Sequence, residues 1–134
     1  MSVPKDVFHS SEFVDCARYG ELDDMKAMIA EYKEQQGLSE LSSATLRDLY
    51  SRKAPPSSST ALHMASANNH VAVISYLLEH LTPDSVNLQN DDGATSLHWA
   101  CVNGHKDAVA LLLKAGADPT IKNLTGRSSV TLAE

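Results

Sequence analysis

The stretch Ser59-Thr60-Ala61-Leu62-His63-Met64-Ala65 occurs again, with small changes, as Ala94-Thr95-Ser96-Leu97-His98-Trp99-Ala100. The two copies start thirty-five residues apart, and a degenerate third copy, Arg127-Ser128-Ser129-Val130-Thr131-Leu132-Ala133, follows thirty-three residues later. Self-similarity at a period of about 33 residues is typical of proteins built from stacked helix pairs. Such arrays act through an extended surface, so the pattern predicts a binding protein and not an enzyme.

Composition agrees with one compact domain. The chain has 134 residues, of which 43% are hydrophobic and 21% charged, as in globular proteins. No apolar run approaches the roughly 20 residues that span a bilayer, and the start, Met1-Ser2-Val3-Pro4, lacks the apolar stretch of a secretory signal. Cys16 and Cys101 have no metal-ligand spacing. We therefore expect a cytoplasmic and nuclear protein without membrane contact or cofactor.

The net charge of −6 is unevenly distributed. Between Lys53 and Lys106 there is no lysine or arginine, whereas this stretch carries Glu79, Asp84, Asp91 and Asp92. An uncompensated acidic segment repels nucleic acid and attracts a basic partner. The alternative interpretation is ordinary charge that keeps the protein soluble, and the sequence leaves both open.

Aligned on its repeats, the chain divides into four units, at about residues 10–35, 57–90, 91–123 and 124–134. Gly20, Asn69 and Gly104 stand at the break between the two helices of the first three units. Asparagine tolerates the left-handed backbone that such a break needs. The fourth unit lacks a second helix, so we expect either an incomplete end of the stack or part of a longer scaffold.

Residues 36–59 interrupt the period and form an insertion or linker. Ser42-Ser43 predicts the cap of a short helix that carries Leu46, Leu49 and Tyr50 on one face. The stretch Ala54-Pro55-Pro56-Ser57-Ser58-Ser59 ends this helix, since paired prolines favour extended chain. The insertion is either a mobile, partner-specific element or a long loop without a role.

These residues resemble the ankyrin-repeat family, whose pattern joins a glycine turn, Thr-Pro-Leu-His-x-Ala, Gly-His, and a leucine helix that ends in Gly-Ala-Asp. The third unit matches this pattern at Gly93, Thr95, Leu97, His98, Ala100, Gly104, His105, Leu111, Leu112, Leu113, Gly116, Ala117 and Asp118. It departs at Ser96, which replaces the proline, and the second unit departs at Asn69 and at Leu81-Thr82-Pro83. The resemblance implies an all-α solenoid of about three and a half to four helix-turn-helix units with short hairpin-like turns.

The early Ala17-Arg18-Tyr19-Gly20-Glu21-Leu22-Asp23 segment and the insertion that follows the first helix pair are similar to the YAR-type ankyrin chaperones of fungi. This resemblance implies a dedicated chaperone or adaptor, itself a monomer. It would shield a basic protein, the small-subunit ribosomal protein S-three, during ribosome assembly. Two alternatives stay open: a regulatory ankyrin inhibitor of a kinase or transcription factor, and a structural fragment of a larger scaffold.

The repeated histidines, His63 and His98, invite a metal-binding or acid-base interpretation. They lie at matching repeat positions without a nearby third ligand or nucleophile. In ankyrin repeats this histidine braces the turn through hydrogen bonds, and we expect the same here with Thr60 and Thr95 as neighbours. We expect His70 and His105 to be structural too, and we expect no catalytic residue and no metal.

The candidate binding surface follows from the repeat register. Turn tips and the exposed sides of the first helices form a concave wall in such stacks. We therefore expect partner contacts at Tyr19, Met64, Asn68, Asp91, Asp92, Ala94, Trp99, Val102 and Asn103. Trp99 is either a binding anchor or a packed residue, and Asp91 and Asp92 either pair with basic residues of the partner or simply solvate a turn.

Overall fold

The computed structural model describes residues 8–129, and this part of the chain is all-α. Its helices are α1 (Ser10–Arg18), α2 (Leu22–Gln35), α3 (Ser43–Tyr50), α4 (Ala61–Ala67), α5 (Val71–Leu78), α6 (Pro83–Val86), α7 (Ser96–Val102) and α8 (Lys106–Lys114). None of these described helices has the length and hydropathy of a membrane span.

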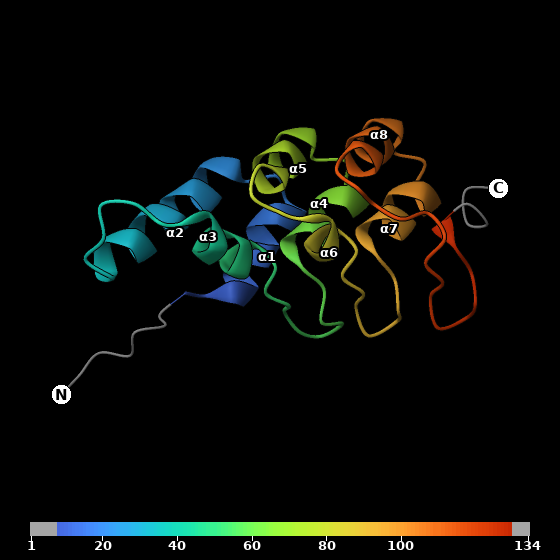
Figure 1. Cartoon of the computed structure of the whole chain (residues 1–134), viewed down its shortest axis with the longest axis horizontal. Helices are drawn as coiled ribbons and strands as arrows, with labels where there is room; N and C mark the ends of the chain where they lie inside the picture. Colours follow the sequence, from blue (N-terminus) through green and yellow to red (C-terminus); the bar gives the residue numbers. More distant parts are fainter. Residues whose placement is uncertain (1–7, 130–134) are drawn as a thin grey trace.

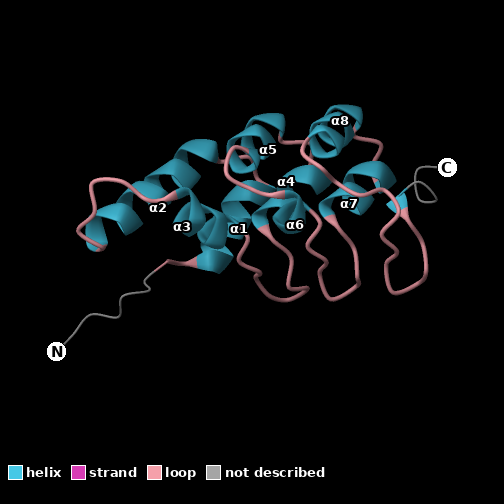
Figure 2. Ribbon diagram, in the orientation of Figure 1, coloured by secondary structure: helices cyan, strands magenta, loops and turns pink. Residues whose placement is uncertain are grey.

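The helices form two rows with loops projecting from one side (Figure 1). α1, α4 and α7 make the inner row and pack successively on one another. α2, α5 and α8 make the outer row, and three long loops hang below the inner row (Figure 2). The predicted fold is therefore confirmed for the first three helix pairs, whereas the helix predicted for the fourth unit lies largely at residues 130–134, outside the described residues.

Small residues let the inner helices approach closely. Ala61, Ala65 and Ala100 have no exposed surface, and they face neighbours at positions where a larger side chain would separate the helices. Larger apolar side chains fill the space between the two rows, and the fully buried ones include Met25, Leu62, Ile74, Leu77, Leu97 and Leu112. Burial of such side chains supplies most of the stability of a repeat stack.

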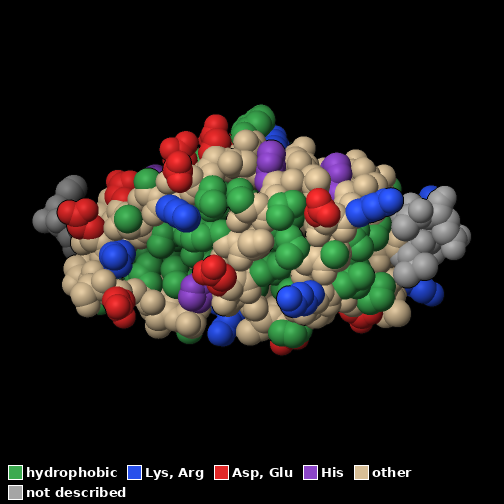
Figure 3. All heavy atoms as spheres, turned by 90° about the horizontal axis from the view of Figure 1, so that it is seen from above, with side chains coloured by type: hydrophobic (Ala, Val, Ile, Leu, Met, Phe, Trp, Pro, Cys, Tyr) green, Lys and Arg blue, Asp and Glu red, His purple; other side chains and the backbone are tan. Residues whose placement is uncertain are grey.

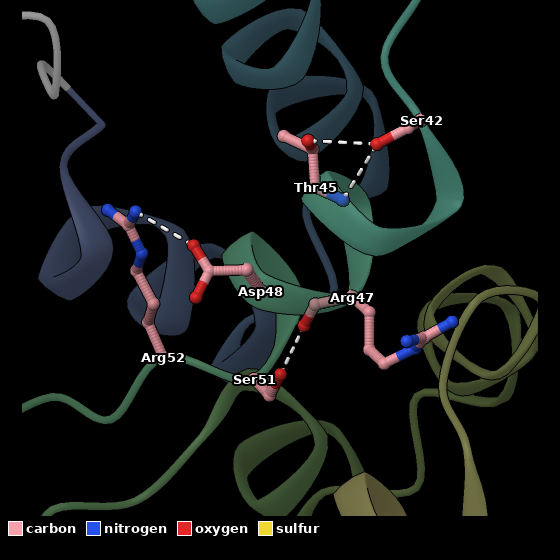
Figure 4. A network of polar contacts seen from close by, with 6 residues as sticks. All are labelled: Ser42, Thr45, Arg47, Asp48, Ser51 and Arg52. Atoms are coloured by element: carbon pink, nitrogen blue, oxygen red, sulfur yellow. Dashed lines mark hydrogen bonds and ion pairs between the residues drawn. The ribbon is translucent and has the colours of Figure 1, made fainter.

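The insertion contains the predicted helix, α3, and this helix is packed. The Ser42 hydroxyl accepts a hydrogen bond from the Thr45 amide at 3.1 Å, which confirms the predicted cap (Figure 4). At the other end of α3, Arg52 pairs with Asp48 at 3.0 Å. Tyr50 is buried and its ring stacks on Phe13, with centroids 5.8 Å apart. α3 therefore joins the hydrophobic core next to α1.

Residues 54–59 belong to the repeat stack and not to the insertion. Ala54 and Ser59 exchange backbone hydrogen bonds of 2.9 and 3.2 Å, which close a short antiparallel bridge. The loop inside this bridge lies beside the loops of the next two units (Figure 1). The second unit thus starts at its turn, before Thr60.

The helix breaks have the predicted left-handed backbone. Asn69 has φ of +56°, close to the +73° of Gly20 at the matching position of the first unit. A Cβ on Gly20 would lie 2.6 Å from Nδ1 of His70, so that glycine also makes room for the next unit. The substitution of asparagine for glycine at 69 therefore keeps the conformation, as expected for the side chain that best tolerates it.

Candidate protein-binding surface

Three loops, which we call the fingers, project from the inner row at residues 54–59, 90–94 and 123–127. The second and third fingers share an Asn-x-x-Gly sequence, and each asparagine holds its own turn. Oδ1 of Asn90 accepts the amides of Asp92 and Ala94, both at 3.0 Å. Oδ1 of Asn123 likewise accepts the amides at 125 and 127 at 3.0 Å. Such turns direct the side chains at their tips outward.

Backbone hydrogen bonds join the fingers to one another. The Asp91 amide donates to the Ser57 carbonyl at 2.9 Å, and the Leu124 amide donates to the Asp92 carbonyl at 3.0 Å. A Cβ on Gly93 would lie 2.8 Å from the Leu124 nitrogen, so the third finger packs directly on this glycine. The finger tips consequently form one continuous edge rather than three independent loops.

The repeated histidines fasten each unit to the next finger. Nδ1 of His63 accepts the Thr60 amide at 3.1 Å, while its Nε2 lies 2.8 Å from the Ala94 carbonyl. His98 repeats the arrangement: its Nδ1 accepts the Thr95 amide at 3.0 Å, and its Nε2 lies 3.0 Å from the carbonyl at 127. The predicted bracing role of these histidines is therefore confirmed, and their nitrogens are occupied by backbone groups.

A second pair of histidines fastens each unit to the preceding inner helix. Nε2 of His70 lies 2.8 Å from the Arg18 carbonyl at the end of α1. Nε2 of His105 lies 2.9 Å from the Ala67 carbonyl at the end of α4. Each bond satisfies a carbonyl that the helix end leaves without an intrahelical partner. These histidines are structural, as expected.

Burial lowers the pKa of His63 from 6.5 to about 4, and this effect outweighs the hydrogen bond to Ala94, which favours the protonated form. The imidazole is therefore neutral near pH 7, with its proton on Nε2 directed at the Ala94 carbonyl. A buried, neutral and fully engaged imidazole is suited to holding the turn and not to proton transfer with a substrate.

Six of the expected contact residues have exposed side chains. Asp91 and Asp92 lie on the tip of the second finger, and Asn68 and Asn103 end α4 and α7. Tyr19 is 65% exposed and Val102 54% exposed. The side-chain Nδ2 groups of Asn68 and Asn103 each donate to the backbone carbonyl four residues earlier, at 2.9 and 2.8 Å, which holds the two side chains in matching orientations. These six residues remain candidates for partner contact.

The prediction of partner contact is wrong for Met64 and Ala94, because the structure buries both side chains. Met64 is only 8% exposed and belongs to the hydrophobic core, since it sits on the side of α4 that packs against neighbouring elements. Ala94 is 5% exposed, because its carbonyl turns inward to meet His63. Trp99 is half-buried and packs edge-on against His63, with ring centroids 5.3 Å apart, in agreement with the packing interpretation.

A strongly acidic groove between α1 and α2 was not among the features predicted from the sequence. It has a volume of about 580 Å³, and its carboxylates are those of Glu12, Asp15, Glu21, Asp24 and Glu31. Acidic side chains gather at the α2 end of the molecule in Figure 3. The signal in the sequence was their helical spacing: Glu12 and Asp15 are three residues apart on α1, and Asp24 and Glu31 are seven residues apart on α2, which places each pair on one face of its helix.

Comparison with known proteins finds a matching family model, a similar solved structure and similar curated proteins. A family model described as ankyrin repeats, in three copies, matches residues 13–123. The structure is similar to the chaperone in the crystal structure of the yeast ribosomal protein Rps3 in complex with its chaperone Yar1. This match has a TM-score of 0.77 and 34% identity, and it covers 97% of this chain and 85% of that chain.

The curated relatives match over a shorter length. An ankyrin repeat-containing protein of Schizosaccharomyces pombe is 44% identical over 75 residues, which are 56% of this chain and 51% of that protein. The palmitoyltransferase Hip14 of Drosophila melanogaster is 46% identical over 72 residues, which are 53% of this chain and 11% of that enzyme. The matched part of the chain thus spans about half the length of the Schizosaccharomyces pombe protein and about a tenth of the length of the palmitoyltransferase.

Proposed function

This chain belongs to the ankyrin-repeat family, and on that premise we propose that it is a non-enzymatic chaperone or adaptor that shields a basic ribosomal protein during assembly of the small ribosomal subunit. The partner would be the counterpart of yeast Rps3. The chain would act in the cytoplasm and nucleus as a monomer, without a cofactor and without direct contact to nucleic acid or membrane.

The observation that carries this proposal is the extent of the similarity to the yeast chaperone. The match covers 97% of this chain, including the insertion that separates the first unit from the second. Curated relatives with other names match this chain over about 70 residues, as expected for the repeats alone. Similarity that extends over the insertion favours a shared role more than similarity limited to repeats does.

The finger edge supplies chemistry suited to a basic partner. Asp91 and Asp92 are exposed on the tip of the second finger, and the backbone bonds to its two neighbours hold them in place. Tyr19 and Val102 add exposed apolar area on the inner helices. Carboxylates on a rigid edge attract lysine and arginine, while aromatic and aliphatic side chains elsewhere on the inner helices supply most of the binding free energy.

Binding to purified yeast Rps3 tests the proposal. We expect a stoichiometric complex by isothermal titration calorimetry and suppression of Rps3 aggregation by light scattering. The affinity should fall as salt rises from 0.1 to 0.5 M, since exposed ion pairs are screened. Failure to bind Rps3, together with salt-independent capture of a kinase or transcription factor, would favour the inhibitor alternative.

A matched pair of variants tests the finger site. Asp91→Lys with Asp92→Lys should weaken Rps3 binding about tenfold, since two favourable surface contacts of up to about 1 kcal/mol each become repulsive. Asp84→Lys with Asp107→Lys makes the same change in net charge on α6 and α8, away from the fingers, and should have little effect. Equal affinities for both variants would exclude the finger tips as the contact.

A further inference from the structure

The groove between α1 and α2 lies on the side of α1 that faces away from the repeat stack. Glu12, Asp15 and Tyr19 line it from α1 and follow one another at intervals of three and four residues. Phe13 and Ala17, which are buried in the core, lie on the opposite side of the same helix. The groove is therefore a surface of the first unit that the packing with α4 leaves open.

The groove walls carry negative charge that no ion pair within residues 8–129 compensates. Five carboxylates line the groove, at residues 12, 15, 21, 24 and 31, and no lysine or arginine of the described residues does. None of the five forms an ion pair with a residue in the described range 8–129. The pKa of Cys16 beneath them is raised to about 11, first by burial and then by the charges of Glu21 and Asp24. Like charges along one groove attract cations of matching spacing.

The floor of the groove is apolar. Tyr19, which is 65% exposed, lines it together with the half-buried Met28 and with Ala27. A smaller adjoining pocket shares Met28 and is lined by Phe8 and Tyr32, whose rings contact each other edge-to-face with centroids 5.9 Å apart. Aromatic and methionine side chains are enriched where partners bind, because they give large contact area and adapt their shape.

We propose that this groove binds an amphipathic helix of a partner protein, with lysine and arginine side chains against the carboxylates and apolar side chains against Tyr19 and Met28. The carboxylates recur at helical spacing along two neighbouring helices, so a third helix laid between them would present cations to both walls. Binding of a helix in an apolar groove is a common mode of peptide recognition. The inference goes beyond the proposed function, since it uses the groove carboxylates and Met28 and shares only Tyr19 with the proposed Rps3 contacts.

A designed peptide tests the groove directly. The probe is an 18-residue helix with leucine on one face and lysine and arginine on the other, and the control peptide has glutamate in place of every basic residue. In ¹⁵N-labelled full chain, the basic peptide should shift the amide resonances of α1 and α2, while the acidic peptide should shift none. Shifts restricted to the fingers, or equal binding of both peptides, would overturn the proposal.

Two variants with equal net charge separate the groove from general attraction. Glu12→Lys, Asp24→Lys and Glu31→Lys together should weaken binding of the basic peptide about tenfold or more in a fluorescence anisotropy titration. Asp84→Lys, Asp91→Lys and Asp107→Lys change the net charge equally outside the groove and should alter the affinity at most about twofold. Equal losses in the two variants would mean that the peptide follows overall charge and not this groove.

A single variant tests the apolar floor and does not depend on charge. Tyr19→Ala should weaken the basic peptide about fivefold, as expected for an exposed aromatic contact. It should leave the thermal unfolding temperature unchanged, because this side chain is largely outside the core. Unchanged affinity in Tyr19→Ala would exclude the proposed seating of the helix. Displacement of the peptide by Zn²⁺ or Ca²⁺ at micromolar concentration would instead assign the carboxylates to a metal.

Discussion

Acidification should destabilise the array through His63. This imidazole is buried, accepts the Thr60 amide and donates to the Ala94 carbonyl, so it folds as the neutral form. In the unfolded chain its pKa returns to about 6.5, whereas in the folded chain it is about 4. Between these values the unfolded state binds more protons. The stability that His63 contributes is therefore complete above pH 6.5 and is lost as the pH falls toward 4.

The size of this effect follows from the two pKa values. Each unit of difference corresponds to about 1.4 kcal/mol once the pH lies below both values, so the full loss is about 3 kcal/mol. Between pH 7 and pH 5 the same relation gives a loss of about 2 kcal/mol. This is a large share of the roughly 5–15 kcal/mol that stabilises a typical domain.

Urea unfolding at pH 7, 6, 5.5 and 5, followed by far-UV circular dichroism and Trp99 fluorescence, measures the effect. The variant His63→Gln is less stable at pH 7, but it lacks the titrating imidazole. Its free energy of unfolding should therefore fall by about 2 kcal/mol less between pH 7 and pH 5 than that of the native chain. His9→Gln removes an exposed imidazole and serves as the control. Parallel declines in the native chain and His63→Gln would refute this account of His63.

Two further substitutions test the packing. Gly93→Ala should lower stability by about 1–3 kcal/mol more than Gly104→Ala in urea unfolding: both glycines have φ near +70°, but only the Cβ at 93 would meet the Leu124 backbone, at 2.8 Å. Equal losses would show that the third finger adapts. Ser96→Pro should raise the free energy of unfolding by about 0.5–1 kcal/mol, because Ser96 is the first residue of α7, where proline is favoured. The Ser96 hydroxyl has no hydrogen-bond partner in the described residues, and Thr95 already has the extended backbone that precedes proline. A lower unfolding temperature would instead mean that the proline ring does not fit at this buried position.

Local spacing made several features predictable from the sequence. The threonine and histidine of each repeated stretch are three residues apart, which is the distance at which a cap residue and the third helical residue bond to each other. The left-handed break at Asn69 followed from its alignment with Gly20 and Gly104. The cap at Ser42 is also a contact over three residues. Each of these caps and breaks depends only on a few neighbouring residues and on the repeat register, so the amino-acid sequence alone predicts it.

What only the tertiary structure decided is which surfaces remain exposed. Met64 and Ala94 stand at positions that the register assigns to the binding wall, yet packing between units buries both. The stretch 54–59 looked like part of an insertion, but the hydrogen bond from the Asp91 amide to the Ser57 carbonyl joins it to the second finger across more than thirty residues. The acidic groove likewise forms only when the carboxylate faces of α1 and α2 turn toward each other.

The division has a physical reason. Repetition in the sequence determines the backbone plan, because hydrogen bonds within a turn or a helix end involve residues close along the chain. The chemistry of a surface depends instead on the relative rotation of packed helices, which is set by the shapes of all the side chains between them. The chain order therefore identified a stack of helix pairs, and the packing decided which side chains remain on its surface.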